Sequence, residues 1–307
     1  MNKISIIGGA GRVGETTALV IAEQGLSREV ALLDVGEGAA EGAARDIQQS
    51  ASFFRFDVQV HGGHDPSIIG DSDLVIVTAG SPRRPGMSRG DVLQTNRAVI
   101  DGIIEQVLRH APHALLLLVT NPVDALTWHA WKQTGWDRSR VFGQGGVLDA
   151  SRMANAITEE TGLSSRDIQT LVIGGHDDSM VPLFRFSCIS GIPVTKFLDA
   201  AAIERVTEHT CKGGAEVLAL RKTSSAYNAP AAAIATMVDA ISHNRNRILP
   251  CVCVLDGEYG ERDVTAGVPA IVGRQGIKRV VELDLNETEL ADFRRSVKGI
   301  RATIELL

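Results

Sequence analysis

The segment from residue 80 to residue 89, Gly-Ser-Pro-Arg-Arg-Pro-Gly-Met-Ser-Arg, has the residue types needed to bind an anion. Arg83, Arg84 and Arg89 carry permanent positive charges, and each guanidinium can bind a carboxylate or phosphate through two parallel hydrogen bonds. The prolines and glycines are typical of a shaped loop. This loop follows an apolar run at 74–78, which we interpret as a buried parallel strand. Ligands of open α/β sheets bind at such strand ends, so we expect an anionic substrate.

A second group of residues has the chemistry of proton transfer. Asp149 and Arg152 are three residues apart in a predicted helix, so both project from one face. His176 follows a predicted strand at 168–173. A buried carboxylate facing a histidine fixes the tautomer of the imidazole and stabilises its protonated form. A neighbouring guanidinium can then bind a substrate carboxylate beside that histidine.

A glycine-rich turn, Gly9-Ala-Gly-Arg-Val-Gly14, lies between a predicted strand and a predicted helix. Its glycines, including Gly11, permit a tight turn, close approach of a pyrophosphate and close helix packing, while the helix N-terminus favours phosphate charge. Asp34 ends the next strand, where a carboxylate accepts hydrogen bonds from the adenosine ribose and repels a 2′-phosphate. The pattern predicts NAD rather than NADP. The alternative, a turn that only packs, leaves Asp34 unexplained.

The elements that must position these residues alternate between strand and helix in the first half of the chain. Predicted strands cover 4–7, 30–33, 58–60, 74–78 and 115–119, and predicted helices cover 12–24, 37–49 and 91–110. Such alternation predicts an α/β fold with a doubly wound parallel sheet of the Rossmann type. We assign residues 1–143 to this NAD-binding domain.

The second half, residues 144–307, has a different pattern and predicts a mixed α+β domain that binds the substrate. Helices are predicted at 147–161, in two stretches within 195–220, and at 229–241. Strands are predicted at 168–173, 249–255 and 268–272, and a hairpin could begin at 181–187. A last helix should begin near Asn286, where Asn-Glu-Thr-Glu resembles a capping box.

The composition is that of a globular enzyme. The 307 residues are 44% apolar and 22% charged, and a net charge of −6 argues against nucleic-acid binding. Four cysteines are too few for a disulfide framework, and no apolar run approaches the roughly 20 residues of a membrane helix. The N-terminus runs directly into a predicted strand and leaves no room for a signal peptide. We therefore expect a cytoplasmic protein that binds neither nucleic acid nor membrane, and no metal site.

Taken together, these motifs resemble those of the lactate/malate dehydrogenase family. The resemblance covers essentially the whole chain and includes the glycine turn, the arginine loop, Thr-Asn-Pro-Val-Asp at 120–124, Gly-Val-Leu-Asp-Ala-Ser-Arg at 146–152, Gly-Gly-His at 174–176, and Ser-Ala-Tyr-Asn-Ala-Pro-Ala from Ser225. The arginine loop and the Leu-Asp-x-x-Arg segment are the specific parts. The resemblance implies reversible hydride transfer between NAD and a 2-hydroxy acid.

The resemblance also implies a role for each site residue. His176 would be the general acid/base, with Asp149 as its orienting partner. The expected substrate ligands are Arg152 on the carboxylate beside the reacting carbon, Arg89 on the ketone oxygen, Arg83 and Asn121. The expected cofactor contacts are Gly9, Gly11, Arg12, Val13, Gly14, Asp34, Asn96, Val119 and Asn121.

Arg83 distinguishes between substrates within this family. The resemblance implies that an arginine here pairs with a second carboxylate at the far end of the 2-keto acid, where lactate dehydrogenases carry an uncharged residue. Pyruvate would leave Arg83 desolvated and unpaired, which makes the binding of pyruvate less favourable by several kcal/mol. The sequence therefore favours malate and oxaloacetate, a step of the tricarboxylic acid cycle. The alternative is a lactate or other 2-hydroxy-acid dehydrogenase.

One position departs from the family pattern. Asp177 stands directly after His176, where relatives usually have glycine. If the position has a positive φ, Asp is among the better-tolerated residues but is still strained relative to glycine. A second carboxylate near the histidine also favours the imidazolium, so we expect the pKa of His176 to lie somewhat above that of relatives. The alternative is that Asp177 points to solvent and changes little. This departure is also the reason to consider a protein that senses NAD(H) without chemistry, although such a sensor needs no acid/base histidine.

The assembly is predicted only coarsely. The resemblance implies a homo-dimer or homo-tetramer, and small-residue helices near Asp46 and at 229–241 would suit subunit packing. The sequence does not distinguish between the two assemblies.

Overall fold

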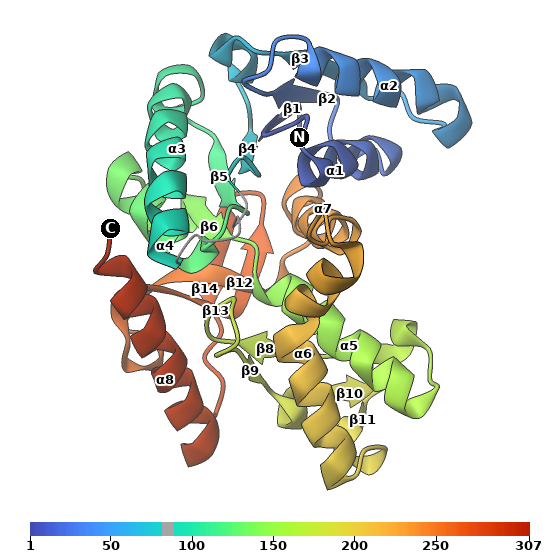
Figure 1. The fold of residues 1–307 in the computed structure, drawn as a ribbon, viewed down its shortest axis with the longest axis vertical. Helices are drawn as coiled ribbons and strands as arrows, with labels where there is room; N and C mark the ends of the chain where they lie inside the picture. The colour runs from blue at the N-terminus through green and yellow to red at the C-terminus, as the bar shows by residue number, and fades with distance from the viewer. Residues whose placement is uncertain (82–88) are drawn as a thin grey trace.

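The first half of the chain forms a parallel sheet with helices on both faces, as the sequence predicts (Figure 1). This computed structural model describes residues 1–81 and 89–307, with Arg89 described by its backbone alone. The strands of this half are β1 (Lys3–Ile7), β2 (Glu29–Leu33), β3 (Gln59–Gly63), β4 (Leu74–Val77), β5 (Leu115–Leu118) and β6 (Val141–Gly143). The helices are α1 (Arg12–Glu23), α2 (Ala39–Phe54), α3 (Arg89–His110) and α4 (Val123–Thr134). The strands lie in the order β3-β2-β1-β4-β5-β6, the doubly wound order.

The central strands are apolar at every position because both faces of the sheet are covered. Leu115 and Leu117 of β5 point into a core cluster that also contains residues of α1 and α2. Leu116 and Leu118 point the other way, into a cluster with α3 and α4. Successive side chains of a strand alternate between faces, so one run of four leucines supplies both cores.

The second half contains more helices and shorter strands. Its helices are α5 (Gly146–Thr161), α6 (Ala200–Arg221), α7 (Asn228–Ser242) and α8 (Glu287–Ile304). Its strands are β7 (Ile168–Gln169), β8 (Val172–Ile173), β9 (Val181–Pro182), β10 (Cys188–Ile189), β11 (Ile192–Pro193), β12 (Arg247–Asp256), β13 (Arg262–Gly273) and β14 (Gly276–Val280). The predicted strand at 168–173 is divided into β7 and β8, and β8 pairs antiparallel with β9. The two helical stretches predicted within 195–220 are a 3-10 turn and the continuous helix α6.

The hairpin β12–β13 extends the parallel sheet of the first half. Val252 of β12 pairs antiparallel with Gly143 of β6, and the sheet continues through β13 to β14. Among the described residues this makes a single sheet of nine strands. The two halves of the sequence therefore share one sheet, which the sequence pattern does not predict.

Two helices of the second half pack against the elements that carry the predicted site. The small side chains of α7 are mostly buried inside the chain, where α7 lies beside α1 (Figure 1). Helix α8 begins at the predicted capping box, in which Asn286 and Glu289 exchange hydrogen bonds. It buries Phe293, Val297 and Ile300 in the main core and packs on β13 and α4.

Candidate active site

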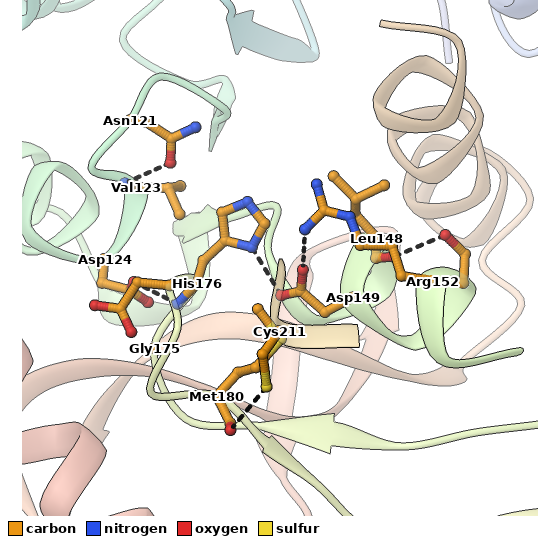
Figure 2. A network of polar contacts seen from close by, with 12 residues as sticks. Asn121, Val123, Asp124, Leu148, Asp149, Arg152, Gly175, His176, Met180 and Cys211 are labelled. Atoms are coloured by element: carbon orange, nitrogen blue, oxygen red, sulfur yellow. Dashed lines mark hydrogen bonds and ion pairs between the residues drawn. The ribbon is translucent and has the colours of Figure 1, made fainter. Parts of the chain in front are cut away.

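Asp149 holds His176 and Arg152 side by side (Figure 2). One carboxylate oxygen, Oδ2, lies 2.7 Å from Nδ1 of His176, and the other, Oδ1, accepts a hydrogen bond of 2.8 Å from Nη1 of Arg152. Helix α5 makes this possible because its residues 149 and 152 are one turn apart and face the loop after β8. The side chain of Asp149 is only 2% exposed. The fold therefore brings together the three residues of the predicted proton-transfer group, His176, Asp149 and Arg152, which we call the Asp149-centred triad.

The contact with Asp149 determines which nitrogen of His176 is free to react. An ionised carboxylate only accepts hydrogen bonds, so Nδ1 must donate and Nε2 is left without the proton in the neutral ring. Figure 2 shows Nδ1 facing Asp149 and the other ring nitrogen on the opposite side of the ring, away from Asp149. This arrangement suits a base that takes a proton from a substrate hydroxyl.

Burial and charge act in opposite directions on His176. Burial lowers the pKa of the imidazole because it disfavours the charged ring, and the guanidinium of Arg152 acts in the same direction. The charge and hydrogen bond of Asp149, with the charge of Asp124, outweigh these effects and raise the pKa above its ordinary value. Asp149 therefore stabilises the imidazolium as well as orienting the ring.

The loop that carries His176 is fixed by its backbone amides. The Gly175 amide donates to Oγ of Ser296 in α8 at 2.8 Å, and the His176 amide donates to Oδ2 of Asp124 in α4 at 2.8 Å. Gly174 forms a bridge to Gly267 of β13 and has φ of 90°, and a Cβ at Gly174 would lie 2.8 Å from Oγ of Ser296. The backbone around His176 is thus held from three elements.

The glycine turn has the shape that a pyrophosphate requires. Gly14 lies so close to the turn that a Cβ there would be 2.3 Å from the carbonyl oxygen of Gly8, so α1 can begin against β1 only with glycine. Gly11 is the N-cap of α1 and supplies no side-chain cap, which leaves the first amides, of Arg12 and Val13, available to an anion. The residues present fit a dinucleotide.

Asp34 is placed at the end of β2, beside the glycine turn. Its Oδ2 accepts a hydrogen bond of 3.0 Å from the Ala10 amide, and its Oδ1 accepts one of 2.8 Å from the Val35 amide. Each carboxylate oxygen can accept a second hydrogen bond, so the side chain remains able to bind ribose hydroxyls. The turn and the acidic residue predicted to act together are therefore adjacent.

Arg12 lies against the loop that precedes α7. Its Nη1 donates to Oγ of Ser224 at 3.3 Å, and its guanidinium lies 5.5 Å from the ring centroid of Tyr227, which also contacts Arg221 at 4.3 Å. The two arginines lower the pKa of the Tyr227 hydroxyl, Arg221 having the larger effect. The cofactor end of the first half thus faces a loop of the second half.

Asn96 joins the loops that follow β4 and β5. Its Nδ2 donates to the Asn121 carbonyl oxygen at 2.7 Å, and its Oδ1 accepts from the Ser81 amide at 2.7 Å. Asn96 is 2% exposed and both ends of its carboxamide are engaged. It therefore fixes the backbone that presents Asn121 and Val119, and its predicted contact with the cofactor stays a prediction.

Two predicted substrate ligands are not placed by the structure. Arg83 lies outside the described residues, as does Arg84, and the side chain of Arg89 is likewise not described. Their predicted roles rest on the sequence alone.

Asp177 does not have the backbone conformation that would strain it. It is absent from the residues with positive φ and is exposed, with its Oδ1 accepting hydrogen bonds from the amide and hydroxyl of Ser179 at 2.8 and 2.6 Å. The rise in the pKa of His176 comes from Asp149 and Asp124. The condition for strain at this position, a positive φ, is therefore not met, and Asp fits here without a left-handed backbone.

We expect Asp177→Gly to leave the pH dependence of turnover almost unchanged, because an exposed carboxylate is screened by water and salt. The acidic limb of the rate profile should move by less than about 0.3 pH unit. Stopped-flow or steady-state rates across pH 5–9 would measure it. A shift toward lower pH as large as a full unit would instead assign Asp177 a direct part in holding the imidazolium.

Sequence reasoning missed two side chains that contact this loop. Asp124 belongs to the Thr-Asn-Pro-Val-Asp motif, but neither that motif nor any pattern around Ser296 predicts a contact with the loop of His176. A carboxylate at the start of a helix usually interacts with that helix's own N-terminus, which gave no reason to expect a contact with His176. Only packing brings the two segments together.

In residues 1–81 and 89–307, every helix is too short or too polar to span a membrane. Across the same residues, histidine, cysteine, aspartate and glutamate side chains do not form a group of three or more that could hold a metal ion.

Two family models together match nearly the whole chain. The model described as the lactate/malate dehydrogenase NAD-binding domain matches residues 2–143, and the one described as the lactate/malate dehydrogenase alpha/beta C-terminal domain matches residues 146–307.

Individual relatives agree with these matches. A malate dehydrogenase of Thioalkalivibrio sulfidiphilus is 58% identical over 307 residues and covers 100% of both chains, and one of Nitrosococcus oceani is 58% identical over 99% of this chain and 97% of its own. The solved malate dehydrogenase of Salinibacter ruber is 38% identical, with a TM-score of 0.94 over 99% of this chain and 97% of its own. The lactate dehydrogenase of Cryptosporidium parvum, solved with lactic acid and cofactor, has a TM-score of 0.95 at 33% identity over 99% and 97%. With the glycine turn, the Asp149-centred triad and these full-length matches in place, the chain belongs to the lactate/malate dehydrogenase family.

Proposed function

We propose that this protein catalyses the reversible, NAD-dependent oxidation of (S)-malate to oxaloacetate. The observation that carries the proposal is the buried carboxylate of Asp149, which holds a proton-transfer group and a carboxylate-binding group 2.7 and 2.8 Å from its two oxygens. Relatives named malate dehydrogenase at 58% identity over essentially the whole chain support the choice of substrate. The lactate dehydrogenase match shows that the fold alone does not distinguish the two activities.

Each side chain of the site has a separate role in the reaction. NAD, when bound at the glycine turn, supplies the hydride acceptor. Nε2 of His176 takes the proton of the substrate hydroxyl, and Asp149 stabilises the imidazolium that forms. Arg152 binds the carboxylate next to the reacting carbon through the edge of its guanidinium that Asp149 leaves free.

Three further residues complete the proposed site. Asn121, whose backbone Asn96 holds, hydrogen-bonds the substrate oxygen near the nicotinamide. Arg89 polarises the ketone, and Arg83 binds the second carboxylate, both by the resemblance of the arginine loop to that of the family. Of the two arginines, Arg83 is the one that favours a dicarboxylate substrate.

The proposed proton transfer fixes the sign of the pH dependence. Malate oxidation needs neutral His176, so its rate should rise with pH through a pKa above the ordinary histidine value. Oxaloacetate reduction needs the imidazolium and should fall over the same range. Whether the rate rises or falls with pH therefore depends on the direction in which the reaction is measured.

We further propose that residues 1–143 bind the cofactor and residues 144–307 supply the substrate side of the cleft. His176, Asp149 and Arg152 belong to the second part, and the glycine turn with Asp34 belongs to the first. The contact of Arg12 with Ser224 supports a site formed between the two parts. The shared nine-stranded sheet means that they are continuous through β6 and β12.

The remaining assignments are also proposals. We propose a cytoplasmic enzyme of the tricarboxylic acid cycle that acts as a homo-dimer or homo-tetramer. Helix α7 is largely buried within the chain, so most of its small side chains are not available for a subunit contact. The surface near Asp46 is the better candidate, because Phe53 at the end of α2 is 85% exposed.

The test is steady-state oxidation of NADH with oxaloacetate and pyruvate in parallel. We expect kcat/KM for oxaloacetate to exceed that for pyruvate by at least about a hundredfold, which corresponds to the several kcal/mol of an unpaired buried charge. Comparable use of the two acids would contradict the assignment of substrate while leaving hydride transfer intact. Absence of turnover with both, despite normal NADH binding, would favour the sensing function.

A further inference from the structure

Asp124 is a buried carboxylate that the proposed chemistry does not use. It lies in the first turn of α4 and is 7% exposed. Its Oδ2 accepts the His176 amide at 2.8 Å, while its Oδ1 is buried and has no hydrogen-bond partner among the residues that the structure describes. A second contact holds its backbone, because Oγ1 of Thr265 in β13 donates to the Asp124 carbonyl oxygen at 2.7 Å. Its position relative to His176 is therefore fixed from two sides.

If only the stability of the fold mattered, a negative charge on Asp124 would be unfavourable. A buried acceptor without a partner is destabilising, and more so when it is charged. Burial raises the pKa of Asp124 to about 7, against the opposing effects of the His176 amide and the His176 charge, while the charges of Asp177 and Asp149 add to the rise. Above that pH, Asp124 carries a negative charge beside the histidine.

The neighbouring amide shows that a carboxylate is not required to hold this loop. The Gly175 amide is held by the neutral hydroxyl of Ser296 at the same distance, 2.8 Å, as the His176 amide is held by Asp124. A hydroxyl satisfies a backbone amide without the desolvation of a charge. The carboxylate thus provides something beyond a hydrogen bond, and the group within reach of its charge is His176.

We propose that Asp124 is a positioning residue for His176 that acts in two ways: it fixes the backbone that carries the imidazole, and its negative charge assists Asp149 in stabilising the imidazolium. The inference rests on the proposed function for its effect on turnover, but its effect on the histidine does not depend on which substrate is used. Figure 2 shows the two carboxylates on different sides of His176, Asp149 at the ring and Asp124 at the backbone.

Asp124 and His176 act on each other through their charges. The charged groups that face Asp124 are His176, Asp149 and Asp177, and Arg152 also acts on the histidine. Removing the charge of Asp124 must therefore lower the pKa of His176, whereas removing the hydroxyl of Ser296 must not.

The test compares Asp124→Asn, Asp124→Ala and Ser296→Ala with the wild-type protein. The side chain of Asn keeps an oxygen for the His176 amide but has no charge, Ala removes both, and the Ser296 variant removes a neutral anchor of the same loop. The pKa of His176 is read directly by NMR of the imidazole, and kcat and KM are measured across pH. NADH affinity, measured by fluorescence, checks that the cofactor end is intact.

We expect Asp124→Asn to lower the pKa of His176 by about 0.5–1 unit and to move both rate limbs to lower pH by the same amount. Asp124→Ala should in addition lower kcat by about tenfold to a hundredfold, because a misplaced catalytic group loses rate steeply, with NADH affinity unchanged. Ser296→Ala should not shift the pKa.

An unchanged pKa of His176 in Asp124→Asn would overturn the inference, and this variant decides the question even if Asp124→Ala fails to fold. An equal shift in Ser296→Ala would also overturn it, since loosening of the loop would then explain both. If the wild-type protein turned over neither acid, the proposed function would fail, but the NMR titration would still test the inference.

Discussion

The Asp149→Asn variant is expected to lose about three orders of magnitude in kcat while keeping its fold and its affinity for NADH. Both oxygens of Asp149 accept hydrogen bonds from donors, one from His176 and one from Arg152. A carboxamide has only one oxygen, so its NH2 group must face one of these two partners. Facing His176, it forces Nδ1 to accept and places the ring proton on Nε2, where a base must be free. Facing Arg152, it displaces the group that binds the substrate carboxylate.

The same substitution removes the charge that raises the pKa of His176. The pH dependence of the remaining activity should therefore be shifted to lower pH than in the wild-type protein, for oxidation as well as for reduction. Single-turnover measurements with pre-bound cofactor would separate this loss of chemistry from product release. A suitable control is Asp292→Asn, which removes a carboxylate of α8 that pairs with Arg295 on the surface. A kcat within threefold of the wild-type value in Asp149→Asn would contradict the proposed role.

The Arg83→Gln variant is expected to lose about a hundredfold to a few thousandfold in its preference for oxaloacetate over pyruvate. The proposed partner of Arg83 is the second carboxylate of the substrate, and a desolvated ion pair that loses one member costs about 3–5 kcal/mol. Since about 1.4 kcal/mol corresponds to a factor of ten, the ratio of kcat/KM should change by that amount. Glutamine keeps the length and polarity of the side chain and removes the charge, so pyruvate should also be used better than by the wild-type protein.

The adjacent Arg84 provides a matched control, since it carries the same group on the same loop and is expected to be solvated. Arg84→Gln should leave the preference unchanged within about threefold, as for an exposed charge. Both arginines lie outside the described residues, so this pair of variants also tests a distinction that rests on sequence alone. If Arg84→Gln changed the preference and Arg83→Gln did not, the assignment of the two positions would be reversed.

Local patterns predicted much of the fold. The parallel sheet follows from apolar runs such as Leu115–Leu118, because only a strand covered on both faces can bury every side chain. The start of α8 follows from the capping box at Asn286. Both signals depend on residues within a few positions of one another. The same is true of Asp149 and Arg152, whose contact follows from one turn of helix.

Motifs at strand ends also placed the larger part of the candidate site. His176 and Asp149 are 27 residues apart, yet each belongs to a recognisable segment, and the structure brings them to 2.7 Å. The glycine turn and Asp34 are likewise adjacent in space. Sequence was less informative about Asn96, whose carboxamide links the loops at Ser81 and Asn121.

The residues with the required chemistry, namely the histidine, the guanidinium groups and the turn that accepts a pyrophosphate, are identified by the sequence alone. The tertiary structure is needed to show how the histidine loop is held, since Asp124 is 52 residues from His176 and Ser296 is 121 residues from Gly175. It also decided that β12 continues the sheet at β6. The physical reason is that periodicity and capping act between near neighbours in the chain. A contact between distant segments depends instead on how whole helices and strands pack, and no local pattern records that.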